Sequence, residues 1–161
     1  MPEFVPDEWA DEWADDVVET AKVPVVPIDA LAAVFVGGAI GGIMRYALAR
    51  AWPVHAGHFP WATLLTNIIG CALIGVLMVI VLETATPHRL ARPFLGVGVL
   101  GGFTTFSTFA VETDRLISSG HATTAIAYLA ASLVGCLVAV WLATTLTRRW
   151  HPLTRMQGRA P

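Results

Sequence analysis

The hydrophobic positions of the chain gather into four long stretches, which cover residues 30–49, 61–82, 94–116 and 123–147. Helices of about 20 to 25 residues extend about 30 to 37 Å at 1.5 Å per residue, enough to cross a hydrocarbon core about 30 Å thick. The connections between the stretches are short and contain prolines or Gly120, residue types that end helices. This pattern predicts an all-α membrane protein with four transmembrane helices.

The charged positions divide the chain into three parts. Nine of the twelve acidic residues lie in residues 1–29, whereas the basic residues lie singly or in pairs at the ends of the apolar stretches. Because acidic segments are repelled by anionic headgroups and short isolated helices are marginal, we expect the extension 1–29 to be disordered. Residues 30–147 then form the four-helix transmembrane domain, and residues 148–161 form a basic C-terminal tail.

The composition excludes several function classes. With 55% hydrophobic and 14% charged residues and a mean hydropathy of +0.64, the chain has too little polar surface for a soluble enzyme domain, which carries about 25% charged residues. Ser107 has no His or Lys at membrane depth to activate it, so covalent catalysis is excluded as well. The basic residues form no stripe interleaved with aromatic residues, which excludes nucleic acid as a partner.

The third apolar stretch has an unusual centre. Four glycines at positions 96, 98, 101 and 102 precede Thr104 and Thr105, and helix propensity is low along this string. We therefore predict a helix that is broken at mid-span. Non-helical backbone at membrane depth persists only where it is buried in protein or lines a water-filled cavity, so a break indicates a transport path or an ion site. The alternative is a closely packed, continuous glycine-rich helix.

Polar side chains within the apolar stretches are few, and most of them are hydrogen-bond donors. Asn67 is the only amide, and an unsatisfied amide in hydrocarbon costs several kcal/mol, so it must face the protein interior or a pore. Tyr128, Ser132 and Cys136 recur every four residues and form one polar row. Glu112 lies near the end of its stretch, where a helix-end or interfacial role is expected. A donor-rich path without an acid at mid-membrane favours a small anion.

Two other patterns have plain interpretations. Gly37 with Gly41, and Gly38 with Gly42, are interleaved GxxxG pairs, which serve contact with a partner chain or packing within one subunit equally well. Cys71 and Cys136 belong to no CxxC pair and to no Cys/His cluster, so we interpret them as small apolar residues of the interior.

Three motifs in order resemble the Fluc fluoride channels, a family also called CrcB: residues 38–46 (GAIGGIMRY), 63–70 (TLLTNIIG) and 101–109 (GGFTTFSTF). The resemblance covers about residues 33–147. It implies a passive channel, not an enzyme, that lets cytoplasmic fluoride leave through two pores of an antiparallel homodimer in the inner (plasma) membrane. It also assigns roles to single residues. Asn67 would hydrogen-bond fluoride; the ring edges of Phe106 and Phe109 would contact it; Thr108, Tyr128 and Ser132 would line a polar track; carbonyls of Gly101 and Thr104 would hold a central structural sodium ion; Arg45 would serve a vestibule or a helix end.

Some features depart from that family. Thr66 stands where valine is usual, Cys136 stands where a serine often continues the polar track, and the acidic extension is unlike the family. Seven Lys and Arg residues on one side against three on the other favour a fixed orientation, which would require an oppositely oriented paralogue as partner. The alternatives are an exporter of the small multidrug resistance type, whose first helix needs a carboxylate, and a membrane assembly protein without a transport role.

Overall fold

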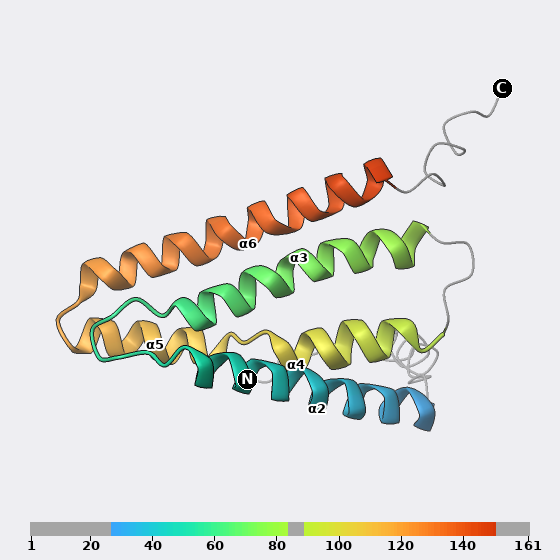
Figure 1. The fold of residues 1–161 in the computed structure, drawn as a ribbon, viewed down its shortest axis with the longest axis horizontal. Helices are drawn as coiled ribbons and strands as arrows, with labels where there is room; N and C mark the ends of the chain where they lie inside the picture. Colours follow the sequence, from blue (N-terminus) through green and yellow to red (C-terminus); the bar gives the residue numbers. More distant parts are fainter. Residues whose placement is uncertain (1–26, 84–88, 151–161) are drawn as a thin grey trace, which may run out of the picture.

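The computed structural model of the chain describes residues 27–83 and 89–150. The helices in this part of the chain are α2 (Ile28–Ala51), α3 (Trp61–Glu83), η1 (Arg92–Leu100), α4 (Gly101–Phe103), α5 (Ser107–Ser118) and α6 (Ala122–Trp150). They form four segments long and apolar enough to cross a membrane: Ile28–Ala51, Trp61–Val81, Arg92–Ser118 and Ala122–Trp150 (Figure 1). The predicted all-α membrane protein with four spans is confirmed.

The helix ends differ from the predicted span limits by a few residues. α2 begins at Ile28 because the Pro27 carbonyl accepts the N–H groups of Ala30 and Leu31 at 3.0 and 3.1 Å. α6 continues to Trp150. Residues 1–26 and 151–161 lie outside the described residues, so the predicted disorder of the extension and the character of the basic tail stay predictions.

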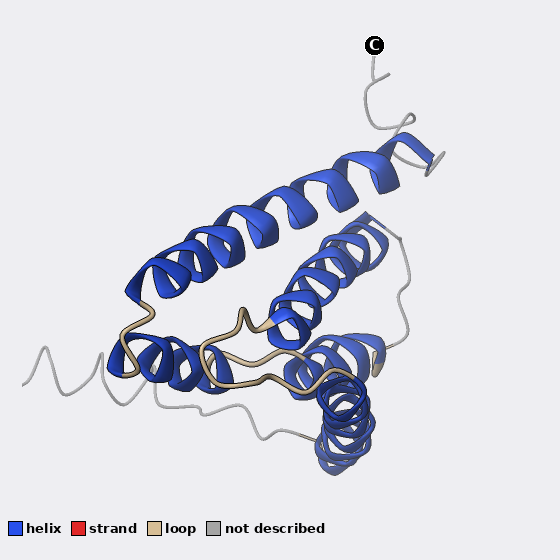
Figure 2. Ribbon diagram, turned by 60° about the vertical axis from the view of Figure 1, so that its left-hand side comes forward, coloured by secondary structure: helices blue, strands red, loops and turns tan. Residues whose placement is uncertain are grey.

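The four spans lie as two pairs. α6 packs along α3, and α2 packs along η1 and α4, the first half of the third span (Figure 1). α5, the second half of that span, contacts α6. Figure 2 shows the loop after α2 and the turn before α6 at the same end of the molecule. The third span is thus shared between the two pairs, its first half with α2 and its second half with α6.

Glycines set the closeness of the contact between α2 and the third span. A Cβ on Gly37 would lie 2.4 Å from the Phe94 carbonyl oxygen, and a Cβ on Gly41 would lie 2.1 Å from that of Val99. Backbone cannot yield at such distances, so this contact requires glycine. Of the two interpretations of the GxxxG pairs, packing within one subunit therefore holds for Gly37 and Gly41. A Cβ on Gly42, by contrast, would have open space around it.

The third span changes helix type along its length. η1 is a nine-residue π-helix and α4 adds three α-helical residues. Thr104 then adopts an extended conformation, with φ −75° and ψ 159°. Helical structure resumes with α5 at Ser107. Residues 104–106 therefore lie outside the helices, between two segments of one span.

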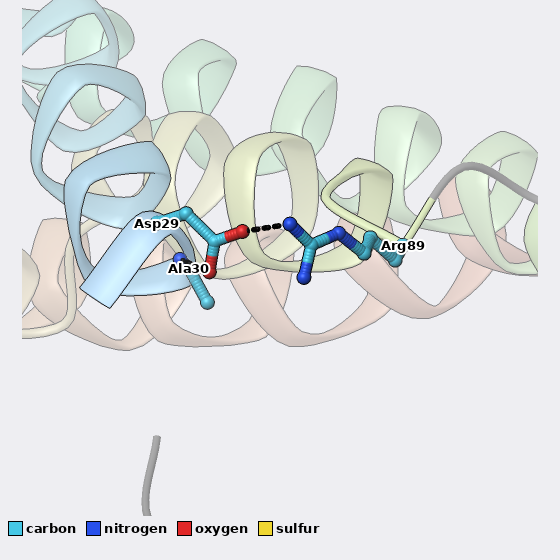
Figure 3. A network of polar contacts seen from close by, with 3 residues as sticks. All are labelled: Asp29, Ala30 and Arg89. Carbon is cyan, nitrogen blue, oxygen red and sulfur yellow. Dashed lines mark hydrogen bonds and ion pairs between the residues drawn. The ribbon is translucent and has the colours of Figure 1, made fainter. Parts of the chain in front are cut away.

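One ion pair ties the start of α2 to the start of the third span. The Arg89 guanidinium donates to the Asp29 carboxylate, whose other oxygen accepts the Ala30 N–H at 2.9 Å (Figure 3). Asp29 also lies in the first turn of α2, where the helix dipole favours a negative charge. The pair is exposed to solvent, and pairs of this kind are worth about 0 to 1 kcal/mol.

Candidate functional site

The non-helical segment of the third span is held by the Asn67 side chain. The Thr105 N–H donates to Asn67 Oδ1 at 2.9 Å, and Asn67 Nδ2 donates to the Thr105 carbonyl at 3.0 Å. The two bonds also define which way the amide points, because only this orientation matches a donor to an acceptor in both. The amide of α3 thus takes the place of a helical partner for both backbone groups of Thr105, and the expectation that Asn67 faces the protein interior is met.

These bonds divert donors from two carbonyls. In an α-helix the Thr105 N–H would donate to the Gly101 carbonyl and the Thr108 N–H to the Thr104 carbonyl. Here the Thr105 N–H donates to Asn67, and the Thr108 N–H donates to Thr105 Oγ1 at 3.2 Å. The Gly101 and Thr104 carbonyls have therefore both lost their usual helical donors. These are the two carbonyls for which the sequence resemblance implies a metal ligand.

An open groove of about 670 Å³ runs beside this segment, between α3, α5 and α6. Most of its lining is aliphatic or aromatic. Five of the residues with predicted roles in fluoride passage or the polar row contribute to it, namely Asn67, Phe106, Phe109, Ser132 and Cys136, and Cys71 does so as well. Within residues 27–83 and 89–150, the buried Ser132 Oγ has no hydrogen-bond partner. A buried hydroxyl without a partner indicates a place where a ligand or a water can bind.

Aromatic rings form one wall of this region. The Phe106 and Phe109 ring centroids lie 5.9 Å apart, and those of Phe109 and Tyr128 lie 5.1 Å apart. Phe59 meets Tyr128 edge to face at 5.4 Å. Phe106 is 79% exposed in the single chain, although an aromatic ring in a membrane protein is normally covered by lipid or protein. Phe109 and Tyr128 are held in place by packing, whereas Phe106 projects from the chain.

A carboxylate lies directly beyond the rings. Glu112 accepts a hydrogen bond from Thr63 Oγ1 at 2.9 Å and one from the Tyr128 hydroxyl at 2.8 Å, one on each oxygen. Three spans meet at this carboxylate, since Thr63 lies on α3 and Tyr128 on α6. The helix-end or interfacial role expected for Glu112 therefore describes only part of what it does, because its side chain also links α5 to α3 and α6 by hydrogen bonds.

Arg45 and Thr108 lie in a second, smaller hollow. It has a volume of about 220 Å³, and its lining includes Thr63, Thr66 and Thr105 as well as Arg45 and Thr108. Thr105 lines both this hollow and the groove, and its hydroxyl lies 3.1 Å from that of Thr108. The half-buried Arg45 brings a positive charge to the same hollow as these threonine hydroxyls.

A family model described as "CrcB-like protein, Camphor Resistance (CrcB)" matches residues 32–144 of the chain. The chain belongs to the CrcB-like family. The protein of Streptomyces avermitilis named fluoride-specific ion channel FluC 2 is 56% identical to it over 70% of this chain and 68% of that protein. FluC 1 of Streptomyces coelicolor is 52% identical over 80% of each chain, and FluC of Saccharophagus degradans is 40% identical over 81% of this chain and 98% of that protein.

In this CrcB-like chain the predicted site residues fall into four groups. Asn67, Phe106, Phe109 and Ser132 share the groove; Tyr128 packs behind it against Phe109; Thr108 and Arg45 share the smaller hollow. Gly101 begins the three-residue helix α4, and Thr104 follows its end. Their roles with fluoride or sodium stay predictions. Family membership does confirm that the chain is a multi-pass membrane protein of a non-enzyme class.

Sequence reasoning missed the roles of two residues that the site depends on. Thr105 supplies the backbone groups that pair with Asn67, and Glu112 joins three spans. One signal was available for Glu112, because it follows Phe109 by three residues and therefore lies on the same helix face. For Thr105 nothing local distinguishes it from Thr104, since its partner lies 38 residues away in the sequence.

Proposed function

We propose that the chain is a passive, fluoride-selective channel that lets cytoplasmic fluoride leave across the plasma membrane. The observation that carries this proposal is the groove in which Asn67, Phe106, Phe109 and Ser132 lie together, in a chain whose relatives are named fluoride-specific ion channels. A small anion must be stripped of water to pass a narrow path, and convergent donors replace that water.

The donors available in the groove suit such an anion. Asn67 Nδ2 carries two hydrogens and gives one to Thr105, so the other remains for a ligand. The Ser132 hydroxyl has a hydrogen to offer, since no partner holds it within the described residues. The edges of Phe106 and Phe109 carry the positive end of the ring quadrupole. Together these groups would replace part of the hydration shell of fluoride.

Glu112 modifies the proposed path. Its carboxylate accepts the hydrogen of Tyr128, so in this arrangement the Tyr128 hydroxyl does not point a donor at an anion. A negative charge beyond the rings repels an anion that lingers there, which favours its onward movement. We propose that Tyr128 and Thr63 hold this carboxylate in place, and that Thr108, beside Arg45, lies on the continuation of the polar track.

We propose that the segment 104–106 is the mid-span break of the third helix and that two copies of the chain pair antiparallel around it. Phe106, at 79% exposed, would then meet a second subunit rather than lipid. Each pathway would need residues of both subunits, which gives two pathways in a dimer. A homodimer is the simplest form, and the charge bias of the chain keeps an oppositely oriented paralogue as the alternative partner.

The Gly101 and Thr104 carbonyls fit a sodium ion at the centre of that dimer. A hard cation takes oxygen ligands, and both carbonyls have lost their usual helical donors. A Cβ on Gly101 would meet nothing within 4 Å, so space is open at this point of the single chain. When bound, the ion would supply positive charge near the anion path and link the two subunits.

Fluoride efflux from liposomes tests this function, with a phenylalanine elsewhere on the chain as matched control. Phe106 is 79% exposed and Phe35, on α2, is 78% exposed, so their replacement removes rings of equal exposure. We expect Phe106→Ile to slow efflux about tenfold or more, which corresponds to about 1.4 kcal/mol, and Phe35→Ile to leave it unchanged. Equal efflux from both variants would contradict the proposal.

The two alternative functions find no support in the site. An exporter of the small multidrug resistance type needs a carboxylate within its first helix, and the one acid of α2 is Asp29, in its first turn and paired with Arg89. A purely structural membrane protein would use its glycine faces to bind other chains, whereas Gly37 and Gly41 pack within this chain itself.

A further inference from the structure

The two cysteines of the chain line the same groove. Cys71 lies on α3 and Cys136 on α6, and both contribute to the groove lining. α3 and α6 are in direct contact beside them, since a Cβ on Gly135, next to Cys136, would lie 2.8 Å from Cδ1 of Ile68, three residues before Cys71. They belong to different apolar stretches, 65 positions apart, so nothing in the sequence pairs them. The packing of α6 along α3 brings them together.

Their positions continue the line of polar groups in the groove. Cys71 lies four residues after Asn67, and Cys136 lies four residues after Ser132, so each thiol is one helical turn beyond a polar side chain of the same face. Both cysteines are half-buried rather than sealed in the core. A solute that reaches Asn67 and Ser132 therefore also meets the thiol pair.

Two thiols without further ligands are selective in what they bind. Soft thiolates prefer soft metal ions, and Hg²⁺ is satisfied by two sulfurs in a line, whereas Zn²⁺ takes four ligands. Within the described residues no group of three or more His, Cys, Asp or Glu side chains is placed to hold a metal. Two thiolates also cancel the charge of a divalent ion, and a neutral complex suits an apolar groove better than a charged one.

We propose that Cys71 and Cys136 form a two-thiol site for a soft divalent cation of the Hg²⁺ type, and that an ion held there closes the groove to anions. On binding, two S–H bonds break, two S–Hg bonds form and two protons pass to water, with no change of oxidation state. The closure of the groove rests on the proposed function, but the binding of the metal does not.

Binding is tested first on the purified full chain, titrated with Hg²⁺ and followed by sulfur-to-mercury charge-transfer absorbance and by intact mass. The chain has only these two cysteines, so the signal has one source. We expect one Hg²⁺ per chain. Cys71→Ser and Cys136→Ser should each bind about 100-fold more weakly, because the second thiol acts as an intramolecular ligand. Two ions per chain, one ion per two chains, or a single variant as tight as the unmodified chain would overturn the two-thiol site.

Closure is tested by fluoride efflux from liposomes, with each variant compared with its own rate before Hg²⁺ is added. The unmodified chain should lose at least about nine-tenths of its efflux at one Hg²⁺ per chain and recover it with a dithiol chelator, whereas Cys71→Ser with Cys136→Ser should keep its own rate. Continued efflux with the complex formed would overturn closure. Absence of efflux before any addition would instead count against the channel function, and the absorbance titration would still decide the metal site.

Discussion

The two halves of the third span meet their neighbours in different ways. The first half, η1 and α4, contacts α2 through backbone, with glycines at the closest points. The second half begins where the helix stops, and it is held by side chains: Asn67 on the Thr105 backbone, and Glu112 with Thr63 and Tyr128. One half depends on the absence of side chains, the other on particular polar ones.

The difference follows from where the backbone hydrogen bonds go. A continuous helix satisfies its own N–H and C=O groups, so only shape has to match its neighbour, and small residues provide that match. Where the helix stops at Phe103, the freed groups of Thr105 need partners from another span. Membrane interiors offer no water to do this, so a polar side chain at that depth has both a structural and a functional task.

The largest expected effect comes from removing the amide that holds the non-helical segment. Asn67→Ala leaves the N–H and C=O of Thr105 without their partners, at a cost of about 1 to 3 kcal/mol each. We expect fluoride efflux to fall about 100-fold or more, since about 2.7 kcal/mol corresponds to that factor. Hydrogen exchange of the Thr105 amide should become faster in parallel.

Thr66→Val is the matched control on the same helix. Its hydroxyl is buried and donates to the Ala62 carbonyl of its own helix at 2.8 Å, so its loss should leave both measurements close to those of the unmodified chain. If Asn67→Ala kept full efflux and a protected Thr105 amide, the bridging role of Asn67 would be wrong.

Alanine variants of two adjacent glycines test the contact between α2 and the third span. Gly41→Ala places a Cβ 2.1 Å from the Val99 carbonyl oxygen, whereas a Cβ on Gly42 meets nothing within 4 Å. Overpacking of this kind costs about 1 to 3 kcal/mol, so Gly41→Ala should lower the thermal midpoint in detergent and Gly42→Ala should not. Equal midpoints for the two variants would show that α2 does not pack on the third span through Gly41.

A smaller effect is expected at the carboxylate that joins three spans. Tyr128→Phe removes one of the two hydrogen bonds to Glu112 and should cost about 1 kcal/mol in the free energy of unfolding. Combined with Glu112→Gln, it should cost less than the sum of the two single changes, because both variants disturb one bond. Strict additivity in this double-mutant cycle would mean that the hydroxyl and the carboxylate act independently.

The smallest effect is expected from the ion pair between Asp29 and Arg89, which joins the start of α2 to the start of the third span. Asp29→Asn removes the carboxylate charge beside Arg89 in an exposed position. The free energy of unfolding should therefore fall by about 0.5 kcal/mol or less, and this loss should vanish at high salt. Thermal midpoints at low and high salt measure it. A large decrease in the thermal midpoint that persists at high salt would contradict the weak, exposed ion pair described here.

The sequence was sufficient for the four spans because apolar stretches of membrane length have few other structures available to them. Their limits shifted by a few residues, since the helix start at Ile28 depends on the Pro27 carbonyl and not on hydrophobicity. The glycine spacing predicted a closely packed face on α2, but spacing within one helix says nothing about which helix lies opposite. That choice, η1 and α4, needed the fold.

The sequence predicted which types of residue form the site better than it predicted which contacts they make. An amide at membrane depth had to be satisfied, which placed Asn67 in the interior, yet its partner is a backbone segment that only the packing of α3 on the third span supplies. Glu112 was judged by its distance from the helix end, and that distance ignores donors arriving from α3 and α6. The pairing of Cys71 with Cys136 is likewise a product of tertiary structure.

The most direct test of the central claim compares two halides in one preparation. Liposomes that contain the purified chain are loaded with equal fluoride and chloride, and both effluxes are followed with ion-selective electrodes. The account predicts fast fluoride efflux with chloride retained, because the donors of the groove suit the smaller anion. Chloride efflux as fast as that of fluoride, or retention of both anions, would contradict it.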